Sequence, residues 1–199
     1  SIVGTHPIDQ GSIKFHDKEV SKLPVPTIAK LGLLRTFQQT RIYGKLNCID
    51  NMRISAKSTQ DNFLSVFSKI PTELNEKAEQ LLNFVGLYQK RKLRAGDLSF
   101  GQQKLLELAM ALMNEPKMLL LDEPTAGINP TLINGIIDRL IKVNHEFGIT
   151  LLVIEHNMRV IMSLAQHIFC LAHGQLIANG KPEEIKNDQR VIDAYLGVQ

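Results

Sequence analysis

Apolar residues along this chain recur in two patterns, one typical of helices and the other typical of buried strands. In the segment 99–113 they recur at intervals of three and four residues, which predicts a helix with one buried face. The residues of that face are Leu105, Leu108, Ala109 and Leu112, with Leu106 and Met113 beside them. The continuous apolar run Met118–Leu121 is too short for a helix of its own and is typical of a parallel strand covered on both faces.

The same alternation follows residue 130. Apolar residues at spacings of three and four predict a helix that ends at Gly148, and the run 149–154 predicts a second buried strand. The apolar face of this helix comprises Ile133, Ile136, Ile137, Leu140 and Ile141. A strand, a helix and a second strand in this order form a crossover unit whose strands pair in parallel. The chain is therefore expected to have an α/β fold.

Shorter elements are predicted on the N-terminal side of this unit. They are a hairpin that turns at Asp17-Lys18, a short helix after Pro24 and a strand over 33–37. From residue 41 to residue 94 the pattern is helical. One helix over 47–56 is expected to be capped by Asn47, and another begins after Pro71.

The C-terminal part is predicted to close the fold without further chemistry. It comprises a helix over 158–165, a hairpin that turns at His173-Gly174 and one terminal helix over 182–196.

An acidic pair follows the first buried strand. Asp122 and Glu123 stand where the apolar run ends, and two neighbouring carboxylates resist desolvation unless a cation or a reacting proton uses them. In nucleotide-hydrolysing enzymes, an aspartate at such a place holds Mg²⁺ while a neighbouring group positions the attacking water. For the pair alone, an acidic turn that caps the next helix is an equally good interpretation.

Two other predicted strands also end near polar side chains. Gln38 follows the strand over 33–37, and His156 follows the strand over 149–154. Because ligands of open parallel sheets bind outside the carboxyl ends of the strands, Gln38, the acidic pair and His156 are expected to face one site. Taken singly, a glutamine or a histidine that ends a strand is more often a surface turn residue.

The predicted helix at 99–113 begins with a capping motif. Ser99 and Gln102 have the spacing of a capping box, in which each side chain satisfies a backbone N–H group of the first turn. Such a helix start presents N–H groups and a positive dipole end to an anion. The alternative is that both residues only cap their own helix.

Length, composition and charge limit the classes of protein to which this chain can belong. With 199 residues, 44% hydrophobic, and a net charge of +3, the chain fits one globular domain, or one domain with a subdomain. The mild charge and the lack of arginine-rich blocks argue against nucleic acid as a partner. Cys48 and Cys170 form no CxxC pattern, which argues against a zinc site or a disulfide framework and suits a reducing, cytoplasmic compartment. No apolar run is long enough to span a bilayer, so work at a membrane is expected only through partners.

Four segments taken together resemble the ATPase subunits of ATP-binding cassette (ABC) transporters. They read LSFGQQ, MLLLDEP, AGINP and IEHNM, and their order and separations give the resemblance its specificity. It covers essentially the whole chain. The AGINP loop and the closing DAYLG also resemble the branched-chain amino acid importer branch. The phenylalanine in LSFGQ, in place of the commoner LSGGQ, and the YLG ending also occur in lipopolysaccharide-export ATPases, which stay an alternative.

The resemblance implies a P-loop NTPase-like parallel sheet core with an inserted α-helical subdomain and flanking antiparallel hairpins. The ATPase core would comprise residues 1–40 and 114–199, and the helical subdomain with the signature motif would comprise residues 41–113.

The resemblance also implies the cofactors ATP and Mg²⁺ and a role for each candidate residue. Gln38 would sense Mg²⁺ and the attacking water, Asp122 would support the metal, and Glu123 would be the general base. His156 would contact the γ-phosphate. The residues that would contact nucleotide held mainly by a second subunit are Ser99, Gly101 and Gln102.

Partners are implied by the same resemblance. The chain is expected to pair with a second ATPase subunit, identical or different, and to bind transmembrane permease subunits at the inner face of the cell membrane. It would energise the uptake of branched-chain amino acids or a similar small solute. A degenerate subunit that only completes a partner's site is the second hypothesis. A cassette ATPase of chromosomes or ribosomes is disfavoured because the interval 38–98 leaves no room for a long coiled-coil insertion.

One departure from the family concerns phosphate binding. The 199 residues contain no GxxxxGK[ST] loop, and the segment 96–103 has its glycines but has glutamines where the lysine and the hydroxyl residue are needed. The opening SIVGTHPIDQGSIKF resembles the segment on the C-terminal side of that loop in the family. We therefore expect these residues alone to bind ATP poorly and to be marginally stable, because a sheet without that loop's strand has an unpaired edge.

Overall fold

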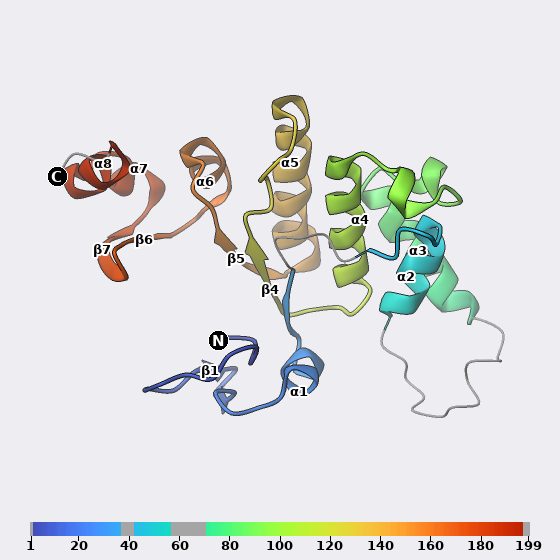
Figure 1. The fold of residues 1–199 in the computed structure, drawn as a ribbon, viewed down its shortest axis with the longest axis horizontal. Coiled ribbons are helices and arrows are strands. Elements are labelled where there is room, and N and C mark those ends of the chain that lie inside the picture. Colours follow the sequence, from blue (N-terminus) through green and yellow to red (C-terminus); the bar gives the residue numbers. More distant parts are fainter. Residues whose placement is uncertain (1, 37–41, 57–70, 197–199) are drawn as a thin grey trace. The chain divides into compact units, whose positions relative to one another are not determined.

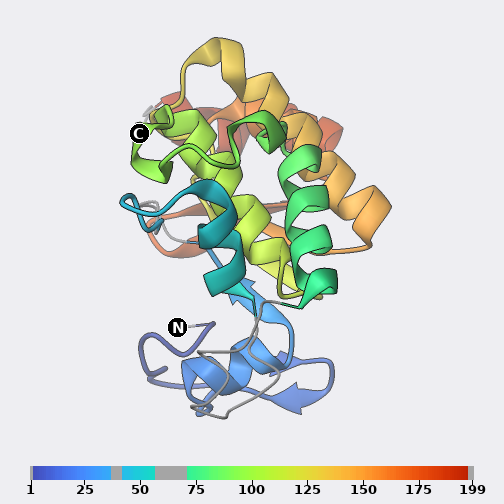
Figure 2. The same ribbon diagram turned by 90° about the vertical axis from the view of Figure 1, so that its right-hand side faces the viewer.

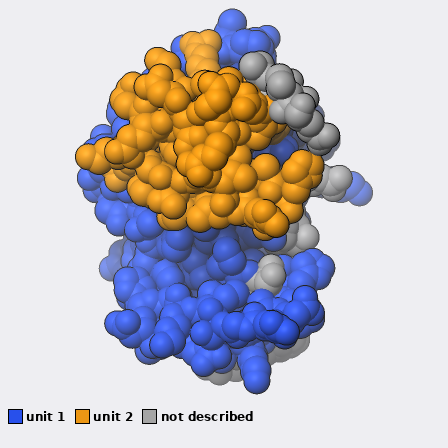
Figure 3. Space-filling view, turned by 90° about the vertical axis from the view of Figure 1, so that its left-hand side faces the viewer, with its two compact units in different colours: residues 1–154 blue, residues 155–199 orange. Residues whose placement is uncertain are grey.

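The computed structural model describes residues 2–36, 42–56 and 71–196. The chain divides into two compact units, Ser1–Ile154 and Glu155–Gln199, which are coloured separately in Figure 3. Among the described residues, no helix is both long and apolar enough to cross a lipid bilayer.

A parallel sheet forms the centre of the first unit. Its strands lie in the order β3 (Leu33–Arg35), β4 (Met118–Asp122) and β5 (Thr150–Ile154). Both pairings are parallel, so the three carboxyl ends lie at one edge, where Asp122 pairs with Ile154. The predicted α/β fold with parallel strands is confirmed.

The two predicted buried strands differ in how deeply they are covered. The middle strand β4 is buried at its three central residues, including Leu119, which has no exposed surface. In β5 the central residues are only half-buried, and Ile154 is 59% exposed. The prediction of full burial is wrong for β5, because within the described sheet it has a neighbour on one side only.

Helix α5 (Pro130–Phe147) connects β4 to β5 (Figure 1). Asn129 caps its start by accepting a hydrogen bond from the Thr131 N–H at 3.1 Å, and Pro130 occupies the first helical position, where its missing N–H costs nothing. Gly148 ends the helix with φ 66°, in the left-handed region that glycine tolerates. The predicted helix and its end are confirmed.

Three of the described helices lie between β3 and β4 in the chain and pack against one another in Figures 1 and 2. They are α2 (Cys48–Ser55), α3 (Thr72–Phe84) and α4 (Phe100–Leu112), with the short 3₁₀ helices η2 (Tyr88–Lys90) and η3 (Ala95–Asp97) between α3 and α4.

Side chains tie these three helices together. Arg53 donates two hydrogen bonds to Asn75 Oδ1, at 2.9 and 2.7 Å, and Asn114 Nδ2 donates to the Ser55 carbonyl at 2.8 Å. The Asn47 cap of α2 is confirmed, since its Oδ1 accepts from the Asp50 N–H at 2.8 Å.

Helix α4 is buried more widely than its sequence pattern predicts. Leu106, Leu108, Ala109 and Leu112 are buried as expected, but Leu105 is only half-buried, and Glu107 and Met110 are buried as well. The reason is that α4 packs against α2 and α3 on one side and meets residues of β4 and α5 on another. The apolar residues at helical spacing therefore mark only part of the buried surface of α4.

The N-terminal part, blue in Figure 2, packs against β3. The hairpin consists of β1 (Lys14–Phe15) and β2 (Lys18–Glu19), and it turns at His16-Asp17, one residue earlier than predicted. Helix α1 (Val25–Lys30) comes next, as expected. The buried residues of this part form one cluster with the sheet: Val3, Val20, Ile28, Leu33 and Leu120.

The second unit contains α6 (Met158–Leu164), β6 (Ile168–Ala172), β7 (Gln175–Gly180), α7 (Pro182–Lys186) and α8 (Gln189–Leu196). Its antiparallel hairpin turns at His173-Gly174 as predicted. The prediction of a single terminal helix is wrong. The helix stops at Asn187, and Asp188 starts another by accepting a hydrogen bond from the Arg190 N–H at 2.9 Å. The expected division into a core of 1–40 and 114–199 and a helical subdomain of 41–113 stays a prediction.

Candidate functional site

The acidic pair lies at the carboxyl edge of the parallel sheet. Asp122 is the last residue of β4, and its Oδ2 accepts a hydrogen bond from Arg35 Nη2 at 2.8 Å. Arg35 is the last residue of the neighbouring strand β3. The side chain of Arg35 is 29% exposed, and that of Asp122 is 21% exposed. Sequence reasoning missed Arg35, although a charged residue ending a short apolar strand is a signal that could have found it.

Glu123 has an unusual backbone conformation. Its φ is 47°, in the left-handed region that costs an ordinary residue about 1–2 kcal/mol. Neighbouring backbone groups hold it there, because its N–H donates to the Ile154 carbonyl at 2.9 Å and its own carbonyl accepts from the Ala126 N–H at 3.1 Å. Strained residues of this kind cluster at functional sites.

The other described non-glycine residues with positive φ have ordinary explanations. His16, Asp17 and His173 lie in hairpin turns, and Glu115 follows the end of α4. Glu123 instead stands directly after a strand, as the second residue of the acidic pair.

The start of α4 has the predicted capping box. Ser99 Oγ accepts from the Gln102 N–H at 3.4 Å, and Gln102 Oε1 accepts from the Ser99 N–H at 3.2 Å. A helix start leaves its first N–H groups without intrahelical partners, so those of Phe100 and Gly101 point out of the helix end. Ser99 and Phe100 are exposed, whereas Gly101 is buried. This end of α4 can therefore present N–H groups to an anion.

A loop joins the acidic pair to α5 and passes the start of α4. Thr125 is buried, and its carbonyl accepts from the Ile128 N–H at 3.3 Å. A Cβ added to Gly101 would lie 3.6 Å from Ile128 Cγ2 and 3.2 Å from Leu132 Cδ1. The start of α4 thus meets the loop that begins at Glu123 through Gly101.

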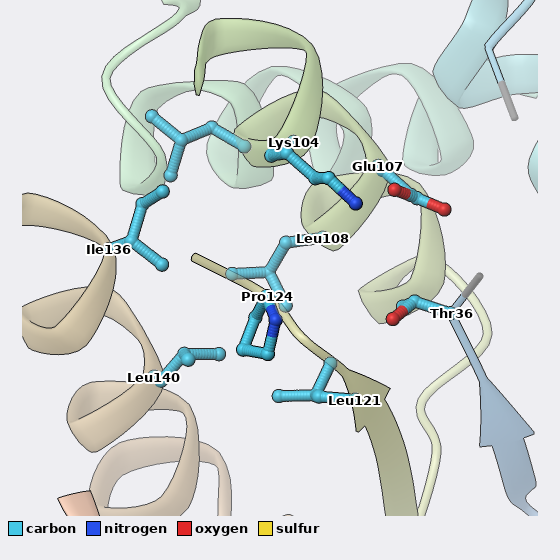
Figure 4. A pocket seen from close by; sticks show the side chains of 9 residues that line it. Thr36, Lys104, Glu107, Leu108, Leu121, Pro124, Ile136 and Leu140 are labelled. Atoms are coloured by element: carbon cyan, nitrogen blue, oxygen red, sulfur yellow. The ribbon is translucent and has the colours of Figure 1, made fainter. Parts of the chain in front are cut away.

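A small cavity is lined by Leu121 and Pro124, which flank the acidic pair in the chain. Figure 4 shows it among Leu108, Leu121, Pro124, Ile136 and Leu140, with Thr36, Lys104 and Glu107 to one side in this view. Its volume is about 30 Å³, which is room for a water molecule but far too little for a nucleotide. The cavity is a packing feature of the α4–β4–α5 layer. Glu107, 8% exposed, is a buried carboxylate that no sequence pattern indicated.

The two remaining candidates are placed differently. Gln38 lies outside the described residues. His156 belongs to the second unit and is exposed. Its N–H donates to Glu155 Oε2 at 3.2 Å, just before the Asn157 side chain caps α6. In the chain His156 stands two residues after the end of β5.

The donor set at the acidic pair suits Mg²⁺. Magnesium prefers hard oxygen ligands and is usually held by one or two carboxylates together with phosphates and water. Asp122 offers a partly exposed carboxylate beside Glu123, and the described residues contain no group of three or more His, Cys, Asp or Glu that could hold a metal by themselves. The arrangement fits a metal shared with a phosphate ligand.

Two models of known protein families match parts of this chain. Residues 1–126 match the family model described as ABC transporter, and residues 175–199 match one described as branched-chain amino acid ATP-binding cassette transporter.

Two curated relatives are similar over nearly the whole chain. The probable branched-chain amino acid transport ATP-binding protein LivG of Archaeoglobus fulgidus is 34% identical, with 100% of this chain and 79% of the relative covered. The high-affinity branched-chain amino acid transport ATP-binding protein BraF of Pseudomonas aeruginosa is 36% identical, with 94% and 76% covered.

Solved structures show the same fold. A nucleotide-free ATP-binding cassette from an ABC transporter superposes with a TM-score of 0.82 at 32% identity, covering 98% of this chain and 80% of that one. An ADP-bound cassette from an ABC transporter gives 0.83 at 31% identity, with the same coverage.

Proposed function

This chain belongs to the ABC transporter family as an ATP-binding subunit, and from this premise we propose that it hydrolyses ATP to drive the import of branched-chain amino acids. The observation that carries the proposal is the acidic pair at the carboxyl end of β4, between the ends of β3 and β5. Two carboxylates at this edge, one ion-paired and one in a strained backbone, are arranged for metal and proton chemistry.

In the proposed reaction Glu123 accepts a proton from the water that attacks the γ-phosphate of ATP. A carboxylate is a suitable general base when it lies within hydrogen-bond reach of the water, and the clamped backbone of Glu123 restricts where its side chain can be. Asp122 would hold Mg²⁺ through a carboxylate oxygen. When bound, the ion neutralises charge on the phosphates.

The remaining candidates have the proposed roles that the family resemblance implies. Gln38 senses Mg²⁺ and the attacking water, and His156 contacts the γ-phosphate. The α4 start, comprising Ser99, Gly101 and Gln102, contacts nucleotide held mainly by the second ATPase subunit, and its N–H groups and dipole suit a phosphate.

The proposed assembly has two ATPase subunits and transmembrane permease subunits. In it the chain lies on the cytoplasmic side of the membrane and is attached through the permease subunits. The proposed solute class rests on the C-terminal family match and on the two curated relatives, which are described as branched-chain amino acid transport proteins.

The test is reconstitution of the complex with its permease and solute-binding partners into lipid vesicles. We expect uptake of radiolabelled leucine that requires ATP and Mg²⁺ on the side of the ATPase, with no uptake of labelled glucose. ATP hydrolysis without leucine uptake would reject the proposed solute only. If the vesicles do not hydrolyse ATP, the catalytic proposal fails. If hydrolysis survives Glu123→Gln, the chain acts as a subunit that completes a partner's site.

A further inference from the structure

The side chain of Phe100 lies against the backbone of the loop after the acidic pair. A Cβ added to Gly127 would lie 3.2 Å from Cε1 of Phe100, 3.8 Å from Cδ1 and 3.9 Å from Cζ. Gly127 also has φ 71°, which favours glycine over any residue with a side chain. Position 127 therefore combines a tight approach of an aromatic ring with a backbone conformation suited to glycine.

A cation lies near the same ring. Lys104 Nζ, one helical turn after Phe100 on α4, is 5.7 Å from the centroid of the ring, within the range of a cation–π interaction. The ring is thus restrained by Lys104 of its own helix while it contacts Gly127 of the loop.

Gly127 and Glu123 lie in the same short loop, so a displacement of one affects the backbone of the other. The Ala126 N–H donates to the Glu123 carbonyl at 3.1 Å, and the Glu123 N–H is bonded to Ile154. A shift of Gly127 therefore acts on a turn whose first residue is Glu123. A second contact between the same two segments is the close approach of Gly101 to Ile128.

We propose that Phe100 is a positioning residue that couples the first turn of α4 to Glu123 through its contact with Gly127. When the first turn of α4 engages a phosphate, the aromatic ring carries the resulting shift to the loop and aligns the Glu123 carboxylate. This inference rests on the proposed function, because it concerns the alignment of the base for ATP hydrolysis. Phe100 is 44% exposed and therefore also contributes buried area to the fold, so the test reads kcat and KM in addition to stability.

The test compares Phe100→Ala and Phe100→Tyr with the control Phe147→Ala in the complete transporter complex. Phe147 is 45% exposed, lies in the same unit and contacts another ring, Phe84, at a centroid distance of 5.0 Å. It therefore matches Phe100 in residue type and exposure but lies away from the site.

We expect Phe100→Ala to lower kcat for ATP hydrolysis about 10- to 100-fold while KM for ATP changes less than about threefold, because it disturbs alignment and not binding. Phe100→Tyr keeps the ring and should restore most of kcat. The control Phe147→Ala should leave kcat near that of the unmodified complex.

A double-mutant cycle tests the contact itself by thermal unfolding. Gly127→Ala should lower Tm less in the Phe100→Ala background than beside the native ring, since the ring that the new methyl group meets is gone. Additive shifts in Tm would overturn the contact. Equal kcat for Phe100→Ala and Phe147→Ala would overturn the coupling alone, whereas an unmodified complex that hydrolyses no ATP would overturn the proposed function and this inference with it.

Discussion

Arg35 Nη2 donates a 2.8 Å hydrogen bond to Asp122 Oδ2, and this ion pair joins the ends of two parallel strands at the edge where the acidic pair stands. A carboxylate has two oxygens, so Asp122 can keep this partner and still offer a lone pair to a metal. The guanidinium nevertheless places a positive charge beside the proposed Mg²⁺ position.

Replacing Arg35 with methionine should strengthen Mg²⁺ binding. The cation competes with Mg²⁺ for the charge of Asp122, so we expect the Mg²⁺ concentration for half-maximal ATP hydrolysis to fall about 3- to 10-fold in Arg35→Met. The matched control is Arg53→Met, whose ion pair with Asp50 on α2 lies away from the sheet edge. A higher Mg²⁺ requirement in Arg35→Met would show instead that the arginine holds Asp122 in the orientation that the metal needs.

The strained backbone of Glu123 predicts an unusual ranking of substitutions. Glycine tolerates φ 47° and alanine does not, so Glu123→Gly should have a free energy of unfolding about 1 kcal/mol higher than Glu123→Ala. The order should reverse at Asp138, which is exposed in the middle of α5. There the free energy of unfolding of Asp138→Ala should exceed that of Asp138→Gly by about 1 kcal/mol. Urea unfolding of the four variants measures both differences. The same ranking at both positions would contradict a strained Glu123.

Asn51 holds the segment before α2 by four hydrogen bonds. It is completely buried, accepts from the Tyr43 N–H at 2.7 Å and donates to three backbone carbonyls. Asn51→Leu removes the acceptor of the Tyr43 N–H and one of the two hydrogen bonds that each carbonyl accepts, and it should lower the free energy of unfolding by about 1–3 kcal/mol. The same change at the exposed Asn83 should cost less than about 0.5 kcal/mol. Similar losses at the two positions would refute the anchoring role.

Cys48 gives the fold a pH dependence in alkaline solution. Its buried thiol donates to the Leu93 carbonyl at 3.4 Å, and burial raises its pKa above the ordinary value of 9.0. The unfolded chain therefore loses this proton first, so the contribution of Cys48 to stability is full below pH 9.0 and falls as the pH rises past it. We expect the difference in unfolding free energy between the native protein and Cys48→Ala to shrink between about pH 8 and pH 10. A difference that stays constant over this interval would exclude the linkage.

The sequence predicts the parts of this molecule whose signals are local. The caps at Asn47 and Ser99, the glycine that ends α5 and the hairpin turn at His173-Gly174 all depend on residues within one turn of the feature. The acidic pair was recognisable for the same reason, because it directly follows a continuous apolar run.

The features that could not be predicted depend on residues far apart in the chain. Arg35 and Asp122 are separated by 87 positions, and only the parallel pairing of β3 with β4 brings them together. The burial of Glu107 and the contact between Phe100 and Gly127 likewise arise from the packing of α4 against other segments. The break between α7 and α8 at Asn187 was missed because an aspartate at position 188 also fits a continuous helix. Its capping hydrogen bond from the Arg190 N–H is visible only in the structure.

The most direct test of the central claim is single-turnover ATP hydrolysis by the transporter complex with Glu123 replaced by glutamine. Glutamine keeps the size of the side chain but cannot accept the proton from water. We predict that Glu123→Gln retains Mg²⁺-dependent ATP binding while its hydrolysis rate falls at least about 100-fold. Hydrolysis within a few-fold of the unmodified complex, with binding intact, would contradict the assignment of Glu123 as the base.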